Sequence, residues 1–458
     1  MPVTSDIEHL LRRTEFVARP ERVAALSRKR RLEQVVGDIL SVPGDPGTVE
    51  FSPGLGENAM ANEYAGYWLD RMVDSPKPMQ ERMALFWHGH FVSSMRKVGK
   101  AAAMREQIDL FRRNGLTDLR RLAIEMSLQV AMLKYLDNNR NRANSPNQNF
   151  SRELMELFLL GVGNYTEADV EAASLAWTGH SIDGATGTYV WRDNWHDGSP
   201  KQFLGTTINR RGDGTQHGPE TISVILGDGI VPHGATNAAN RGRPTAEVAA
   251  EHLSRKLWSE FAGTPPPPAV IAAMRDAAVS SRFSLKPWLT EMFTRPEFYS
   301  DEVKVGLVRS PIAAAVATLA TTRLGGSDVS LSALDAAGQR PLHPPNVSGW
   351  RTNRAWLNAS AMTARADIAT SLSGKAMAGY HNGDQVIRLV GGDLSRTEVR
   401  DTYRDRPIEL VARVLELMQV DVTPETRRAL DDYAVGAPFW ERHHLVRLVM
   451  LSPDLHMA

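Results

Sequence analysis

Apolar residues recur at helical spacing along most of this chain, and that periodicity constrains its fold more than any other feature. One such segment begins at Pro78 and runs through Trp87, and others cover about residues 117–137, 151–160 and 246–262. Helical spacing resumes after a run of four prolines and continues, interrupted by one loop, to the C-terminus. The pattern predicts a mainly α fold in the form of a large multi-helix domain.

Two short stretches depart from the helical pattern. Residues 188–192 and 201–205 have the character of short strands and flank a polar, glycine-containing loop. They predict a small β-hairpin, at about residues 186–206, inserted between helices. Residues 209–245 are rich in glycine, asparagine and arginine and are predicted to form an irregular excursion.

The four prolines after Thr264 divide the chain into two predicted regions. An N-terminal helical region covers residues 1–262, and a C-terminal helical region covers residues 269–458. We find no repeat of fixed period, and we expect the two regions to pack as one compact unit.

Composition excludes several classes of protein. The chain has 53 Lys plus Arg against 53 Asp plus Glu, so it lacks the basic excess of a nucleic-acid binder. It has no cysteine, which excludes disulfides, thiolate metal sites and cysteine nucleophiles. No apolar run is long enough to span a membrane, and the first residues do not resemble an export signal. We therefore expect a cytoplasmic protein that acts on an unknown small-molecule or protein partner.

Two histidines lie close together at the end of the helix that begins at Pro78. His88 and His90 are two residues apart, so they would point to opposite sides of a continuous helix. They could share a ligand only if the helix ended at Gly89 or the segment were extended. The alternative is one packed histidine and one at a helix end, where an imidazolium complements the helix dipole.

Two glutamates share one face of the predicted helix over residues 151–160. Glu153 and Glu156 are three residues apart, so both carboxylates can reach one point. A buried carboxylate requires a cation, either an arginine or a metal ion. The alternative to a shared metal pairs Glu156 with Arg152 and Glu153 with an arginine from residues 138–142.

The tip of the predicted hairpin carries a third group of polar residues. His196, Asp197 and Lys201 would be presented together there by the two strands. The alternative is ordinary turn chemistry, because Asp-Gly is a favoured turn dipeptide. The sequences Gly-x-x-x-x-Gly-Lys-Ser/Thr, Gly-x-Ser-x-Gly and His-Glu-x-x-His do not occur, which weakens assignments to triphosphatases, esterases and zinc peptidases.

Four blocks of this chain resemble the conserved blocks of one known family. They are Gln80-Glu-Arg-Met-Ala-Leu-Phe-Trp-His-Gly-His-Phe91, Asn149-Phe-Ser-Arg-Glu-Leu-Met-Glu-Leu-Phe158, His196-Asp-Gly with Lys201-Gln-Phe-Leu-Gly205, and Pro344-Pro-Asn-Val-Ser-Gly-Trp350. On these blocks the chain is similar, over nearly its whole length, to the bacterial domain-of-unknown-function 1800 family. The resemblance implies no settled activity, and it implies that many relatives are exported. This chain departs from the family's pattern at Glu251-His252, where the family usually has His-Pro.

Because these blocks are rich in polar side chains, we expect one site that gathers them. The leading hypothesis is a metal-dependent enzyme, hydrolytic or oxidative, that binds Mn, Fe, Zn or Mg. Its expected metal ligands are His88, His90, Glu156, His196 and Asp197. Its expected catalytic residues are Glu153, Lys201 and Arg152, and the remaining pocket residues are Asn149, Asn346 and Trp350.

Two other functions stay open at this point. In the first, the protein is a non-catalytic binding or assembly protein, and the polar blocks are interior hydrogen-bond networks that fix one packing. In the second, Lys201 and Asp197 support transfer of a phosphoryl or similar anionic group, although no phosphate-binding glycine loop accompanies them.

Overall fold

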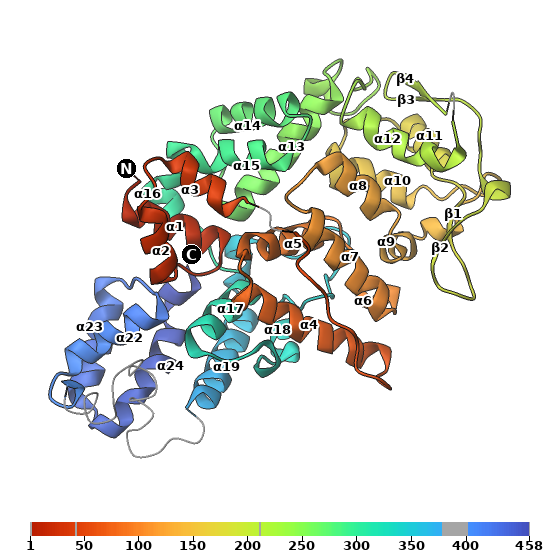
Figure 1. Cartoon of the computed structure of the whole chain (residues 1–458). Helices are drawn as coiled ribbons and strands as arrows, with labels where there is room; N and C mark the ends of the chain where they lie inside the picture. The colour runs from red at the N-terminus through yellow and green to blue at the C-terminus, as the bar shows by residue number, and fades with distance from the viewer. Residues whose placement is uncertain (1, 42–43, 210–211, 378–401, 458) are drawn as a thin grey trace.

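The computed structural model describes residues 2–41, 44–209, 212–377 and 402–457 and confirms the mainly α fold (Figure 1). The helices of the N-terminal part are α1 (Thr4–Thr14), α2 (Pro20–Ser27), α3 (Leu32–Ile39), α4 (Glu57–Asp74), α5 (Pro78–His90), α6 (Met95–Val98), α7 (Ala101–Asn114), α8 (Leu119–Ser127), α9 (Val130–Tyr135), α10 (Asn149–Glu153) and α11 (Glu167–Ala176).

The later helices are α12 (His217–Ile225), α13 (Thr245–Phe261), α14 (Pro268–Ser280), α15 (Leu285–Thr294), α16 (Asp301–Lys304), α17 (Pro311–Thr322), α18 (Leu331–Ala336), α19 (Ala359–Ala376), α22 (Pro407–Met418), α23 (Pro424–Gly436) and α24 (Leu445–Leu451). The strands are β1 (His180–Ile182), β2 (Tyr189–Trp191), β3 (Lys201–Phe203) and β4 (Thr206–Ile208). In the part of the chain described, no helix has the length and apolar character needed to cross a membrane.

The β structure consists of two small hairpins, and the predicted pairing between residues 188–192 and 201–205 is wrong. Instead β1 pairs with β2 and β3 pairs with β4, both antiparallel. The reason is a tight turn after β3, where Leu204 and Gly205 both have positive φ, at 47° and 76°. Two such residues form the turn that best matches the twist of paired strands, so the chain reverses immediately.

Two further predictions of local structure are corrected. The helix expected over residues 117–137 is two helices, α8 and α9, separated at Leu128 and Gln129. The excursion expected over residues 209–245 contains a regular helix, α12. Ile222, Val224 and Ile225 of α12 are buried against the core, and this apolar face stabilises a helix within an otherwise polar segment.

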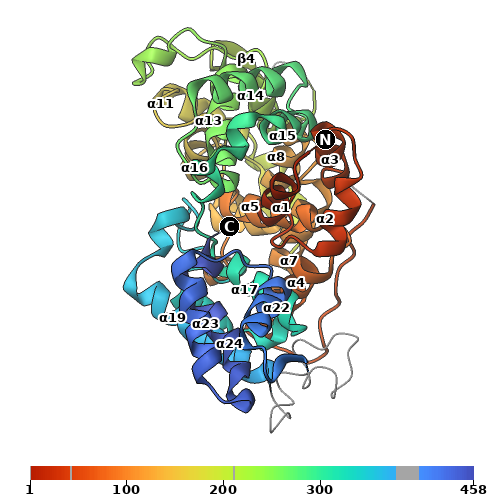
Figure 2. The same ribbon diagram turned by 90° about the vertical axis from the view of Figure 1, so that its left-hand side faces the viewer.

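Helices from both halves of the sequence share one apolar core. A continuous cluster of buried apolar side chains runs from Ile7 to Leu372, and α17 packs on α4 and α15 packs on α3. A second cluster, from Ala369 to Leu455, joins the end of α19 to α22, α23 and α24. In both views these last helices form a separate group at one end of the molecule (Figures 1 and 2).

Helix α5 lies at the centre of the fold, among helices of both halves (Figures 1 and 2). It begins with Pro78 in the first turn, where a missing N–H costs nothing. Nearly all of its residues are buried, including Glu81, His88 and His90. Polar side chains on a helix buried on all sides must find their partners inside the protein, and this requirement places several of them beside a cavity.

Candidate functional site

A cavity of about 310 Å³ lies between α1, α5 and α13 and the loops that precede α17 and α19. Its walls combine basic and apolar side chains. The charged residues that line it are Arg12, Arg82, Lys256, Arg309 and Arg351, which are basic, and Glu260, which is acidic. The larger apolar residues that line it are Phe16, Leu85, Phe86, Leu307, Val308, Trp350 and Trp356.

Acidic side chains neutralise only part of this positive charge. The guanidinium of Arg82 forms an ion pair with Glu260 at 2.7 Å, and that of Arg12 forms one with Asp421 at 2.5 Å. Lys256, Arg309 and Arg351 have no carboxylate partner among the residues that the structure describes. The cavity therefore has an excess of positive charge.

Arg309 is the most deeply buried of these three cavity-lining cations, with 6% of its surface exposed. The C-terminal segment holds it, because its backbone N–H donates to the His456 carbonyl at 2.8 Å and its Nη1 donates to the Leu455 carbonyl at 3.2 Å. Its Nε has no partner. Burial, and secondarily the charge of Arg12, lowers the pKa of Arg309 to about 9. The folded protein thus stabilises this cation poorly without a further anion.

Arg13 is a further buried cation, close enough to Arg309, Arg82 and Arg12 to be affected by their charges. It is fully buried, and its Nη2 donates to the Val303 carbonyl at 2.6 Å, while Nε and Nη1 have no partner. Burial, followed by the charges of Arg309, Arg82 and Arg12, lowers its pKa well below the usual value. Like charges crowded in the interior destabilise one another, and a bound anion would relieve that repulsion.

Lys256 and His90 stand together at another part of the cavity wall. The Lys256 Nζ donates to the Leu157 carbonyl at 2.8 Å and lies 3.4 Å from His90 Nδ1. The His90 Nε2 donates to the Phe158 carbonyl at 2.8 Å, which leaves the lone pair on Nδ1 facing the lysine. Burial lowers the pKa of Lys256 to about 8 and that of His90 far below its usual value.

The two carbonyls that hold these side chains belong to a short π-helix, η2 (Leu154–Leu159), which continues α10. Its wider turn is a common feature of functional segments. His252 Nε2 also lies 3.3 Å from the Leu157 carbonyl. The side chains of His90, His252 and Lys256, from α5 and α13, therefore gather at the C-terminal end of this segment. The helix dipole there favours the positive charge of Lys256.

Trp350 forms part of the cavity wall and carries a buried indole N–H without a partner. Its loop reaches α5 because Gly349, with φ of 83°, sits directly on Gly89: a Cβ atom there would lie 2.1 Å from the Gly89 carbonyl oxygen. Trp350 also contacts His88 edge to face, with ring centroids 5.1 Å apart. An unpartnered donor beside uncompensated cations is suited to an anionic or hydrogen-bonding ligand.

The structure places His88 in the interior and His90 at the last position of α5. Helix α5 continues through His90, so the condition for a shared ligand is not met. His88 is fully buried, and neither ring nitrogen has a hydrogen-bond partner. Burial lowers its pKa to about 3, so the ring is neutral.

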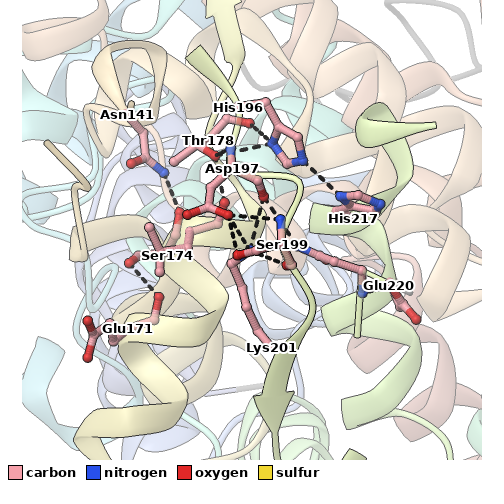
Figure 3. Close-up of polar contacts among 12 residues, drawn as sticks. Asn141, Glu171, Ser174, Thr178, His196, Asp197, Ser199, Lys201, His217 and Glu220 are labelled. Carbon is pink, nitrogen blue, oxygen red and sulfur yellow. Dashed lines mark hydrogen bonds and ion pairs between the residues drawn. The ribbon is translucent and has the colours of Figure 1, made fainter. Parts of the chain in front are cut away.

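His196, Asp197 and Lys201, which were predicted to lie together, do so in a second polar cluster (Figure 3). The Lys201 Nζ contacts Asp197 Oδ1 at 3.0 Å and donates to the Ser199 carbonyl at 2.6 Å. Burial alone would raise the pKa of Asp197. Hydrogen bonds from Ser199 and Lys201 have the larger effect and lower this pKa to about 2. This lysine, unlike Lys256, is neutralised by a carboxylate.

The same cluster contains a histidine that the sequence did not identify. His217, at the start of α12, lies with its Nδ1 2.8 Å from His196 Nε2 (Figure 3). His196 Nδ1 donates to the Thr178 carbonyl at 2.9 Å, so its Nε2 accepts from His217. Nothing in the local sequence marked His217, because it lies in the segment predicted to be irregular.

The remaining predicted residues have local partners. Arg152 pairs with Glu167 at 2.7 Å, and Glu156 accepts from the Tyr165 hydroxyl at 2.6 Å. Glu153 is half-buried, and burial, followed by the charge of Glu156, raises its pKa. Asn149 Nδ2 donates to the Leu136 carbonyl at 3.3 Å. Asn346 is exposed and accepts from the Ser348 N–H at 3.0 Å, which closes its own loop.

The contacts therefore divide the predicted site among separate places. His90 and Trp350 line the basic cavity, whereas His196, Asp197 and Lys201 form the cluster of Figure 3. Within the described residues, no group of three or more His, Asp or Glu side chains could hold a metal ion. The residues that carry most of the cavity's charge, above all Arg309, were missed because no motif surrounds them.

Comparison with known proteins gives one match. Residues 9–457, nearly the whole chain, match the family described as "Protein of unknown function (DUF1800)". No curated protein and no solved structure matches.

Proposed function

Since the chain belongs to the DUF1800 family, whose description assigns no activity, we propose a function from the cavity itself. The protein binds a small organic anion there, with a carboxylate or phosphate group held by the basic side chains and an apolar body held by the aromatic walls. The proposal does not require catalysis, so it leaves both the enzyme and the binding-protein hypotheses open.

The observation that carries this proposal is the excess of positive charge around the cavity. Five basic side chains line the cavity, against one acidic side chain. A buried charge without a counterion is costly, and a ligand that supplies the counterion recovers that free energy on binding. Arginine guanidinium groups in particular match the two oxygens of a carboxylate or phosphate.

The size and lining of the cavity define the class of ligand. A volume of about 310 Å³ falls at the lower end of the range of about 300–1,000 Å³ typical of small-molecule sites. Phe16, Phe86, Trp350 and Trp356 present apolar surface next to the basic groups. These features favour a compact ligand with one apolar face over a bare inorganic anion.

The test is binding by calorimetry and thermal stabilisation with inorganic phosphate, citrate, pyruvate and benzoate. We expect an organic anion to bind the wild type, and Arg309→Gln to weaken it about tenfold to a hundredfold, the worth of a hydrogen bond to a charged group. Arg255→Gln is the matched control, because Arg255 is exposed on α13 next to Lys256 but does not line the cavity. Failure of every anion to bind, or unchanged binding by the Arg309 variant, would refute the proposal.

Metal-dependent chemistry stays a second candidate, favoured by the His196–His217 contact at 2.8 Å. Burial lowers the pKa of both rings, which keeps them in the neutral form that binds metals. Metal analysis of the purified protein tests this candidate. Stoichiometric metal that is lost in His217→Ala but kept in His233→Ala would support it, since His233 is exposed. Only trace metal in the wild type would exclude it.

A further inference from the structure

We propose that Lys256 is a reactive amine that forms a reversible imine with a carbonyl group of the bound anion. The ligand would then belong to the class of anionic aldehydes and oxo acids. This inference rests on the proposed function, because the same cavity holds the anion that the lysine would attack.

The surroundings of Lys256 keep its amine available. It is the only lysine among the described residues that line the cavity, and both of its contacts are to neutral groups, the Leu157 carbonyl and His90 Nδ1. Two contacts leave the third position on nitrogen unassigned. Lys201 provides the contrast, since it is buried, is held by Asp197 and lies outside the cavity.

Burial also makes the reactive form accessible near neutral pH. With its pKa lowered to about 8, roughly one Lys256 in ten is uncharged at pH 7, whereas an ordinary lysine is uncharged in fewer than about one molecule in a thousand. A lysine desolvated in this way is a recognised form of activated nucleophile.

His90 is placed to move the protons that imine formation requires. Because its Nε2–H donates to the Phe158 carbonyl, its Nδ1 carries the lone pair directed at the lysine nitrogen. The ring is neutral in the resting protein, since burial lowers its pKa strongly. It can therefore accept a proton from the attacking nitrogen and return it to the departing oxygen.

The reaction balances without any oxidant or reductant. The lone pair of the Lys256 amine adds to the carbonyl carbon, and the first nitrogen proton passes through His90 Nδ1 to the oxygen, giving a carbinolamine. The second nitrogen proton leaves with that hydroxyl as water while the carbon–nitrogen double bond forms. Arg309 and the other cations would hold the anionic group during both steps, so the amine and carbonyl would meet at high effective concentration.

A purely structural role for Lys256 would be to cap the carbonyl of Leu157. Arginine at this position keeps a positive donor for that carbonyl but cannot form an imine. Lys256→Arg therefore separates the two roles: it should retain the fold while it loses the covalent adduct.

The experiment exposes the full-length protein to glyoxylate, pyruvate or 4-formylbenzoate with cyanoborohydride, which reduces an imine to a stable secondary amine. Peptide mass spectrometry then measures adduct formation at each lysine. We expect Lys256 to be modified at least about tenfold faster than Lys201 and the exposed lysines, an advantage in keeping with its lowered pKa. Modification should slow in Arg309→Gln and in the presence of an anion that binds without a carbonyl.

The two proposals fail in distinguishable ways. If anions bind and Arg309→Gln weakens them, but none of the three carbonyl compounds modifies Lys256 faster than Lys201, the imine inference is wrong and the proposed function stands. If Lys256 is modified rapidly but neither the Arg309 variant nor a competing anion slows it, the lysine is reactive without an anion site, and both proposals are overturned.

Discussion

At the scale of single residues, Glu81 on α5 is a carboxylate held by several buried partners. It is fully buried, and its two oxygens accept from Arg112 Nε at 2.8 Å and Nη2 at 3.0 Å. The Trp68 indole N–H donates to the same group at 3.1 Å. Arg112, also fully buried, has its pKa raised because the hydrogen bonds and charge of Glu81 outweigh the effect of burial.

Loss of either partner should lower the stability of the folded protein. We expect Arg112→Met to lower the free energy of unfolding by about 3–5 kcal/mol, because it leaves the buried carboxylates of Glu81 and Asp109 without their cation. Glu81→Gln should cost less than Arg112→Met, because Arg112 stays paired with Asp109 at 3.0 Å. Urea denaturation measures the change. The control is Glu50→Gln, since Glu50 is 88% exposed in its pair with Arg105 and should contribute less than about 1 kcal/mol. Equal effects of the buried and exposed substitutions would contradict this account.

Sequence reasoning recognised the need for such pairs but not their identity. It predicted buried carboxylates with cationic partners and assigned them to Glu153 and Glu156, which are only half-buried. Glu81 has the same local signature, an acidic residue on an apolar helix. Which of these glutamates is fully enclosed depends on the neighbouring helices that cover it, and spacing along one segment carries no information about those neighbours.

At the scale of elements, the N-terminus of α11 shows local sequence and tertiary contact acting together. Thr166 is its N-cap and Asp169 is the capping-box partner, and both contacts of the box are present. The Asp169 Oδ2 accepts from the Thr166 N–H at 2.8 Å. Its Oδ1 accepts from the Leu204 N–H at 2.8 Å, which ties the helix to the turn between β3 and β4.

Substitutions at these two positions should therefore differ in cost. Thr166→Ala removes one cap and should lower the free energy of unfolding by about 1 kcal/mol. Asp169→Ala should cost about 1–3 kcal/mol more, because the buried Leu204 N–H also loses its acceptor. Thermal or urea denaturation compares them, with Ser330→Ala, which removes the exposed cap of α18, as a control for capping alone. Similar losses for Thr166→Ala and Asp169→Ala would show that the bond to Leu204 contributes nothing.

The elements themselves were predictable to the extent that they are fixed locally. Periodicity, in the segment that begins at Pro78, identified α5. The strands at residues 189–191 and 201–203 were found in sequence but given the wrong partners. Their pairing depends on the positive φ of Leu204, which leucine rarely adopts, so the turn could not be inferred from residue type.

At the scale of the whole molecule, the net charge of zero gives no sign of the basic cavity on which the proposed function depends. The chain carries equal numbers of acidic and basic residues, and this balance disfavoured a large anionic partner. The fold nevertheless collects basic residues that are far apart in sequence, from Arg12 to Arg351, around one cavity. Composition constrains the surface as a whole, whereas a small ligand responds to the charge within a few ångströms, which only the tertiary structure determines.

Buried histidines give the molecule a predictable sensitivity to acid. Burial lowers the pKa to about 3 for His9, His88 and His180, and to about 4 for His252, His343 and His456. An unfolded histidine takes up its proton near pH 6.5, so below that pH the unfolded chain binds more protons than the folded one. The free energy of unfolding must therefore fall as the pH drops from about 6.5 towards about 4.

Urea denaturation at a series of pH values from about 7.5 to about 5 isolates this effect, because carboxylates stay largely ionised there. We expect the wild type to lose stability steadily below about pH 6.5. The slope of stability against pH is set by the difference in bound protons between the unfolded and folded chains, and His88→Leu should reduce that difference by up to one. The substitution should also raise stability near pH 7, because it removes a buried ring whose nitrogens have no partner. A flat profile in the wild type, or an unchanged slope in the variant, would mean that these rings reach solvent and titrate normally in the folded protein.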